Sequence, residues 1–290
     1  MTELKSLLLR ILKDFVSFCD GNHLTYYAAY GTALGAVRHH GFIPWDDDID
    51  VHMPRADYQR LWELRNEIPK PYKVVDIPEL GYTAPFMKFM DINTSVWEFE
   101  RKPYMLGEYI DIFPLDSYQP EDIPHVKEIK KNLDDAFFAY FRSLDKWPSR
   151  ELLSLLYHRY WSEFKKLYNK NQENSRNRNI FHRQVLELLD ELNSTQEGSL
   201  YFSSTDVYLE CPIFEKVWFD NPIDQPFENI TIKIPGDFDS YLRSLYGDYM
   251  ELPPEEERIT HHSRHFVCLN KGLSVRQARR IMRKEAKAQF

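Results

Sequence analysis

Four of the five residues from Asp46 to Asp50 are aspartates. Like charges this close repel one another and gain nothing from an apolar core, so such a cluster is typical of a site for a divalent cation. The residues that follow alternate between apolar and polar, which is the period of a β-strand. This alternation predicts that Asp46, Asp48 and Asp50 share one face and that Asp47 points to the other. Three oxygen ligands on one face suit Mg²⁺, with Mn²⁺ as a second option. The other interpretation is a solvated acidic loop.

A Gly31-Thr32 turn lies upstream of the aspartates, before a short helix predicted for residues 33–39. Free N–H groups and a partial positive charge at a helix N-terminus favour phosphate, and Thr32 can add a hydroxyl contact. Arg38 is suited to bidentate phosphate contacts. The order of strand, Gly-Thr turn, helix and Asp-X-Asp strand resembles the nucleotidyltransferase fold, in which a later strand completes the metal site. Asp111 is the candidate, because it lies between apolar neighbours where an unpaired carboxylate would be costly.

Hydrophobic periodicity predicts an α+β protein with a mixed-sheet core and a helical insertion. The predicted helices span residues 3–19, 33–39, 56–67, 131–144, 151–168, 181–192 and 236–246. The predicted strands span residues 24–29, 46–53, 72–76, 86–92, 96–99, 109–113, 217–219 and 229–234, with Pro114 closing one of them. No glycine occurs between positions 108 and 197, and the polar run 169–179 is predicted to be a loop. We therefore divide the chain into a core (1–118 and 199–265), a helical insertion (119–198) and a C-terminal tail (266–290).

Composition argues against a disordered chain, a disulfide framework and a membrane-spanning protein. Hydrophobic residues make up 43% and aromatic residues 15%, which predicts a globular chain. The three cysteines form no CxxC pair, which fits a reducing compartment, and neither a signal peptide nor a membrane-spanning run is recognisable. We therefore expect a cytoplasmic protein, with a peripheral position at the inner membrane face as an option.

Charge is unevenly spread along the chain. The net charge is −8, but residues 271–290 carry seven Lys or Arg and one Glu. The acidic remainder argues against a nucleic-acid partner. The basic tail is suited to contact with anionic lipid, and the alternative is a solvated helix.

Four separated blocks resemble the LicD family in the same order, and they are also similar to the fukutin-related transferases. The blocks are GTALGAVRHHGFIPWDDDIDVHMPR (31–55), MKFMDINTS (87–95), YIDIFPLD (109–116) and LYGDYMELPPEEERITHH (245–262). The resemblance covers roughly residues 24–118 and 208–265 and does not reach the helical insertion or the tail. It implies an enzyme that transfers a phosphoalcohol, typically phosphocholine, from a CDP-alcohol donor such as CDP-choline. The implied acceptor is a hydroxyl of a cell-surface glycan (teichoic acid, lipopolysaccharide or capsule) or of its lipid-linked precursor.

The resemblance and the chemistry together suggest residue roles. One or two Mg²⁺ ions would bridge the donor pyrophosphate, held by Asp46, Asp48, Asp50 and Asp111. Asp50 or Asp111 could accept the proton of the acceptor hydroxyl, and Asp48 belongs to the same catalytic group. Phosphate and the CMP leaving group would be bound by Gly31, Thr32, Arg38, Lys88, His261 and His262. For Lys88 the alternative is a surface lysine on a strand, and for the two histidines it is a surface pair after a loop.

Three aromatic residues could form a cage for a quaternary ammonium group through cation–π contacts, namely Tyr30, Trp45 and Trp97. The alternative is that they belong to the core. Two other functions use the same residues. One is a Mn²⁺-dependent glycosyltransferase with a nucleotide-sugar donor, and the other is a non-catalytic scaffold in a glycan-assembly complex.

Overall fold

The computed structural model describes residues 1–193, 197–206, 212–260 and 264–288. Its core is an eight-stranded mixed sheet, which confirms the predicted α+β class. The main path runs in the order β1 (Tyr27–Ala28), β2 (Asp50–Pro54), β5 (Leu106–Tyr118), β4 (Met87–Trp97) and β10 (Phe266–Cys268). Off this path, β3 (Tyr72–Val75) pairs with β4, β6 (Leu200–Phe202) pairs with β5, and β7 (Ile213–Glu215) pairs with β6. Only the β2–β5 pairing among these described strands is parallel. A separate hairpin joins β8 (Ile223–Phe227) and β9 (Ile230–Ile234).

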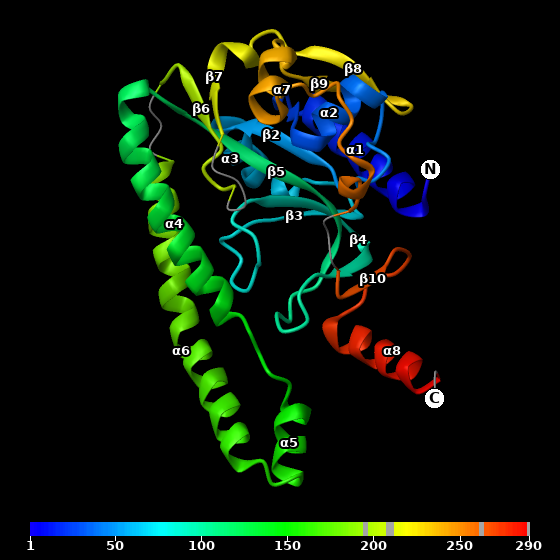
Figure 1. The fold of residues 1–290 in the computed structure, drawn as a ribbon, viewed down its shortest axis with the longest axis vertical. Coiled ribbons are helices and arrows are strands. Elements are labelled where there is room, and N and C mark those ends of the chain that lie inside the picture. The colour runs from blue at the N-terminus through cyan, green and yellow to red at the C-terminus, as the bar shows by residue number, and fades with distance from the viewer. Residues whose placement is uncertain (194–196, 207–211, 261–263, 289–290) are drawn as a thin grey trace.

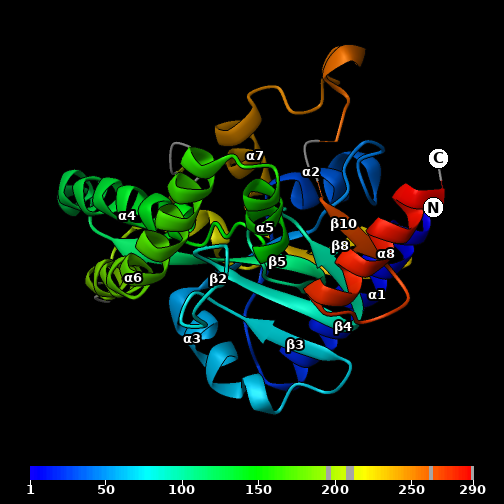
Figure 2. The same ribbon diagram turned by 90° about the horizontal axis from the view of Figure 1, so that it is seen from below.

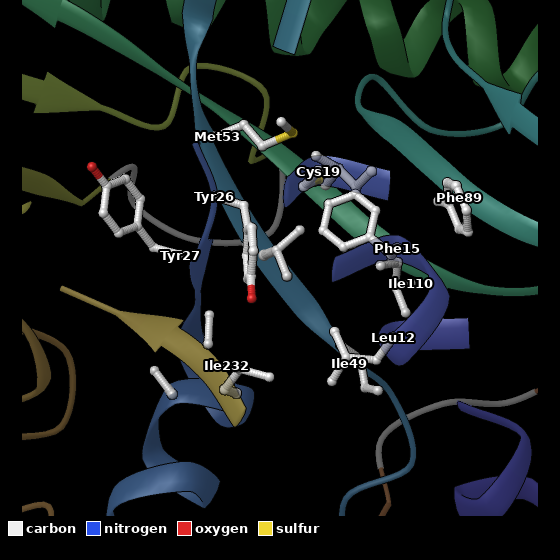
Figure 3. Packing of buried hydrophobic residues seen from close by; sticks show 14 of the residues in the cluster. Leu12, Phe15, Cys19, Tyr26, Tyr27, Ile49, Met53, Phe89, Ile110 and Ile232 are labelled. Carbon is white, nitrogen blue, oxygen red and sulfur yellow. The ribbon is translucent and has the colours of Figure 1, made fainter. Parts of the chain in front are cut away.

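One face of the sheet is covered by α1 (Glu3–Gly21). Its helix begins where the Thr2 hydroxyl accepts a hydrogen bond from the Lys5 amide, a typical N-cap. An apolar stripe at helical spacing is fully buried, comprising Leu8, Ile11, Leu12 and Phe15. The Phe15 ring lies edge-on to the rings of Tyr26 and Phe89, as Figure 3 shows. Burial of each such side chain contributes about 1.5–3 kcal/mol to the free energy of unfolding.

The alternation of side chains along β2 and β5 decides which face carries the polar residues. Val51 and Met53 of β2 and Ile110 and Ile112 of β5 are buried in the same core cluster as the α1 stripe. Successive side chains of a strand point to opposite faces, so Asp50 and Asp111 must lie on the face away from α1.

The remaining helices surround this sheet and extend from it. They are α2 (Tyr30–His39), α3 (Arg55–Glu63) with a 3-10 turn (Leu64–Asn66), α4 (Ile123–Ser143), α5 (Ser149–Tyr157), α6 (Trp161–Leu192), α7 (Phe238–Tyr246) and α8 (Val275–Ala288). Figure 1 shows α4 and α6 as a long antiparallel hairpin that projects from the sheet, with α5 at its far end. A second core cluster holds the two helices together, with Leu133, Phe137 and Tyr140 from α4 and Val185 and Leu189 from α6. No helix within the described ranges is long and apolar enough to cross a membrane.

Two predictions about where helices and strands end were wrong. The reasons lie in contacts between segments that are distant in the sequence. Residues 169–179 lie inside the single helix α6, where buried Asn174 donates a hydrogen bond to the Asp145 carbonyl. Pro114 lies inside β5 and does not end it. A proline is tolerated there because β5 pairs with β4 only up to Ile112 and with β6 only from Asp116, so no ladder bond to either strand needs the missing N–H.

Three further predictions differ from the structure. Residues 216–219 form a 3-10 turn and not a strand. Residues 266–268, which the sequence assigned to the tail, add strand β10 to the sheet beside β4. The strand expected over residues 24–29 is limited to the two residues of β1, because only these pair with β2.

Asp76, directly after β3, is a buried carboxylate whose charge should oppose folding. Its oxygens accept hydrogen bonds from the Tyr58 hydroxyl (3.0 Å) and the Ile77 amide (2.7 Å), but burial outweighs them and raises the pKa of Asp76 to about 6. The native state then holds this proton more tightly than the unfolded chain, so the contribution of Asp76 to stability is fully present below pH ~4 and is lost as pH rises through ~6.

Asp76→Asn should therefore raise the free energy of unfolding by about 3 kcal/mol at pH 8 and leave it unchanged near pH 4. Urea unfolding at the two pH values measures this difference. Asp224→Asn, at an exposed position in β8, is the matched control and should change neither value. Equal destabilisation by Asp76→Asn at both pH values would contradict the prediction.

Candidate active site

A row of charged residues crosses three adjacent strands on the face opposite α1. Asp50 on β2 is the Cα partner of Asp111 on β5, and Asp111 is the partner of Lys88 on β4. The Lys88 ammonium is 2.6 Å from Asp111 Oδ1 and 3.9 Å from Glu98. It also lies 3.6 Å from the centroid of the Tyr109 ring, so a buried ammonium is surrounded by carboxylates and an aromatic face. This contact argues against a free surface lysine at position 88.

The turn before β2 brings three more carboxylates to the site. One ligand oxygen from each of Asp46, Asp47 and Asp48 lies within 4.8 Å of the others. The sequence prediction placed Asp47 on the opposite face, and this was wrong because β2 begins only at Asp50. In a turn, neighbouring side chains are not forced to alternate, so all three can point to one place.

The charges of the turn change the pKa values of the carboxylates on the strands. Loss of solvent contact, followed by repulsion from Asp48, Asp111 and Asp46, raises the pKa of Asp50 well above its usual range. Burial also raises the pKa of Asp111, while Lys88 opposes this shift. Clustered carboxylates with raised pKa values are stabilised by a positive charge placed among them. An all-oxygen donor set fits a hard cation such as Mg²⁺ or Mn²⁺, and the residues that would hold it are Asp46, Asp48, Asp50 and Asp111, joined by Asp47.

Gly31 and Thr32 lie in the first turn of α2, which begins at Tyr30 and so starts earlier than predicted. The Thr32 hydroxyl accepts a hydrogen bond of 2.9 Å from the Asp50 amide, which fixes the start of β2 against the helix. A Cβ at position 31 would lie 2.5 Å from Asp46 Oδ2. The absence of a side chain at Gly31 therefore lets the Asp46 carboxylate lie against the N-terminus of α2, where the helix dipole favours negative charge.

Gly31→Ala should displace Asp46 without unfolding the protein, because the obstructing atom is the end of a flexible side chain. We expect apparent Mg²⁺ affinity to fall by about tenfold or more, with the melting temperature unchanged or slightly raised since Ala is the better helix former. Mg²⁺ titration by calorimetry and a thermal melt provide the two readouts. Gly21→Ala is the matched control, because nothing lies within 4 Å of a Cβ there. Unchanged Mg²⁺ affinity in Gly31→Ala would contradict this role.

Arg38 points to the C-terminal part of the chain in this structure. Its Nη1 donates to the carbonyl oxygens of Tyr249 (2.7 Å) and Glu251 (3.0 Å). The predicted contacts of Arg38 and Lys88 with phosphate remain predictions, since each side chain has a protein partner here. His261 and His262 lie outside the described residues.

The three aromatic residues of the predicted cage have different surroundings. The buried Tyr30 ring contacts His52 and Phe113. Trp45 lies beside His39 and under Arg258. Trp97 is also buried and donates its indole N–H to the Lys102 carbonyl. The cage remains a prediction, and these contacts give it no support.

Sequence reasoning missed two residues that support the row. Glu98, directly after β4, accepts a hydrogen bond from the Tyr109 hydroxyl and adds a second carboxylate near Lys88. Arg264 forms two hydrogen bonds, 2.8 and 2.9 Å, with the fully buried Glu108, and a third of 3.4 Å with the Asp47 carbonyl. Arg264 thus links the acidic turn to β5. No local pattern could identify it, because it is 156 positions from Glu108.

Comparison with known proteins relates this chain to one family. Residues 23–143 match the family model described as LicD/FKTN/FKRP, nucleotidyltransferase domain. The chain is 29% identical over 264 residues to the lipopolysaccharide cholinephosphotransferase LicD of Haemophilus influenzae, an alignment that covers 88% of this chain and 92% of that protein. It is also 33% identical over 85 residues to an uncharacterized protein of Rickettsia prowazekii, covering 29% of each chain.

Proposed function

Because residues 23–143 form a domain of the LicD family, we propose that this protein transfers a phosphoalcohol from a CDP-linked donor to a hydroxyl of a glycan. Phosphocholine is the favoured group, with CDP-choline as donor, since the relative from Haemophilus influenzae is a cholinephosphotransferase that acts on lipopolysaccharide. The proposed acceptor is a surface glycan such as lipopolysaccharide, teichoic acid or capsule, or its lipid-linked precursor. The proposed location is the cytoplasm, at the inner face of the membrane.

The observation that carries this proposal is a cluster of three carboxylates beside a helix N-terminus, whose charges act on a pair of carboxylates on two adjacent strands. Asp46, Asp47 and Asp48 lie together in one turn, and Asp50 lies next to Asp111 on the neighbouring strand. A pyrophosphate is itself negative, so this site needs added positive charge before it can bind such a donor. Bound at these carboxylates, Mg²⁺ or Mn²⁺ would neutralise the pyrophosphate and the charge that develops on the leaving group.

The transfer itself is a displacement at phosphorus. The acceptor hydroxyl oxygen forms a bond to the phosphorus that carries the alcohol, the bond to the bridging pyrophosphate oxygen breaks, and CMP leaves. The hydroxyl proton is accepted by the Asp50–Asp111 pair, whose raised pKa values suit a proton acceptor. Lys88 holds Asp111 in position through the 2.6 Å ion pair, so the carboxylate is oriented before the substrate arrives.

A donor panel tests the proposal. Purified protein with Mg²⁺ is incubated with CDP-choline, CDP-ethanolamine, CDP-glycerol, CDP-ribitol and a UDP-sugar, with or without a lipopolysaccharide acceptor. We expect release of CMP from CDP-choline and transfer of its label to the acceptor. Turnover of the UDP-sugar alone would favour the glycosyltransferase, and reaction with none of the donors would favour the scaffold.

A further inference from the structure

The far end of the helical hairpin exposes four large apolar or aromatic side chains to solvent. Leu153 and Tyr157 of α5 are 62% and 84% exposed, and Tyr160 and Trp161, where α5 turns into α6, are 61% and 64% exposed. We call these four residues the aromatic tip. Figure 1 shows α5 at the end of the hairpin that is remote from the sheet, so the tip projects away from the sheet.

The tip has a defined local structure. Leu153 and Tyr157 are four positions apart on α5 and therefore share one side of the helix. The Tyr160 amide donates a 2.8 Å hydrogen bond to the Leu155 carbonyl, and Arg159 adopts a left-handed φ of 61° in the turn. Leu152 faces the other way and is buried, so α5 has an inner and an outer side. The exposed rings thus lie on a folded turn.

Basic residues lie close to the aromatic tip in the sequence. Residues 146–170 carry six Lys or Arg and two Glu, although the whole chain has a net charge of −8. Arg159, Lys165 and Lys166 are exposed next to the aromatic residues. The basic helix α8 belongs to the second positive segment, residues 271–290, with seven Lys or Arg and one Glu. Both segments are net positive in a protein whose overall charge is negative.

The two positive segments lie side by side. A cavity of about 190 Å³ is lined by Pro148 and Glu151 at the start of α5 and by Arg279, Met282 and Arg283 of α8. In the view of Figure 2, from below the molecule of Figure 1, α5 and α8 are both seen in front of the sheet. One side of the protein therefore combines exposed Tyr and Trp residues with basic residues.

We propose that this side docks on an anionic lipid membrane, with the aromatic tip inserted among the headgroups and α8 lying against the surface. Tyr and Trp favour the membrane interface because their rings are apolar and their edges polar, and each nearby Lys or Arg adds attraction to anionic lipid. A projecting tip can insert between lipid headgroups, whereas a flat protein surface offers it no matching depression. The inference concerns binding to lipid, so it stands apart from the transfer reaction and is tested without donor.

Co-sedimentation with vesicles tests the proposal. The full chain should bind vesicles of equal parts phosphatidylethanolamine and phosphatidylglycerol, bind pure phosphatidylcholine vesicles far more weakly, and dissociate at high salt. The double variant Tyr157→Ser/Trp161→Ser should bind the anionic vesicles roughly tenfold more weakly or worse. Ile180→Ser is the matched control, because Ile180 is also exposed on α6 but lies about 28 Å along the helix from Trp161. It should bind as the unchanged chain does.

Two results would overturn the proposal. One is binding of the double variant to anionic vesicles at the affinity of the unchanged chain. The other is an unchanged chain that does not bind the anionic vesicles but self-associates through the tip. Light scattering would show this as a dimer of the unchanged chain that is lost in the double variant. CMP release from CDP-choline, measured without vesicles, should be the same in all these variants, so a failure of the transferase proposal is recognised separately.

Discussion

Asp48→Ala is expected to lower the rate of CMP release from CDP-choline on the order of a thousandfold, because it removes a central ligand of the proposed metal site. Asp48 shares one cluster with Asp46 and Asp47, and its charge contributes to the raised pKa of Asp50. Loss of this carboxylate weakens both the cation site and, through it, the binding of the donor pyrophosphate.

The same change should leave the protein as stable as before or slightly more stable. Asp48 lies among like charges, so its removal relieves repulsion when no cation is bound. We expect the melting temperature without Mg²⁺ to stay the same or rise. We also expect Mg²⁺ to raise the melting temperature of the unchanged chain and to have much less effect on the variant.

Chromatography of the released CMP measures the rate. Thermal melts with and without Mg²⁺ measure the stability. Asp135→Ala, at an exposed position on α4, controls for the loss of one carboxylate and should behave as the unchanged chain. Turnover by Asp48→Ala near the rate of the unchanged chain would contradict the proposed role of Asp48 in catalysis. Loss of activity together with a lower melting temperature would mean that the residue has a structural role.

Asp116→Ala is expected to reduce the free energy of unfolding by about 3–5 kcal/mol. Arg55 Nε and Nη2 donate to the two oxygens of Asp116 at 2.6 and 2.8 Å, and both side chains are less than a tenth exposed. The Ser204 hydroxyl donates to the same carboxylate. Truncation of Asp116 leaves the buried guanidinium without the carboxylate that balances its charge, which is costly because little water can replace it.

Urea unfolding measures this loss, and a double variant separates the charge from the packing. Arg55→Met/Asp116→Leu removes both charges and should recover most of the stability that Asp116→Ala loses. Arg60→Ala is the matched control, since it breaks the exposed ion pair between Arg60 and Glu63 and should cost less than about 1 kcal/mol. A loss below 1 kcal/mol in Asp116→Ala would show that the buried pair is not needed for stability.

Sequence reasoning reached the parts of the molecule that local patterns encode. The stripe of α1 and the alternation around Asp50 and Asp111 have periods of 3.6 and 2, and the structure forms a helix and two strands there. Alternation also implied that Asp50 faces away from the apolar residues beside it, and it placed Asp111 between apolar neighbours on a later strand. The resemblance to the LicD family rests on these same short blocks, which is why it agrees with the match over residues 23–143.

Contacts between distant segments decided the rest, because no local period records which strand pairs with which. Lys88 meets Asp111 only through the register of β4 and β5, and Arg264 meets Glu108 across 156 positions. Pro114 is tolerated because of where β4 ends and β6 begins. The chemical character of the acidic site was thus readable from a few neighbouring residues. Its precise composition, including Asp47, depended on a turn that contacts α2 directly and β5 through Arg264.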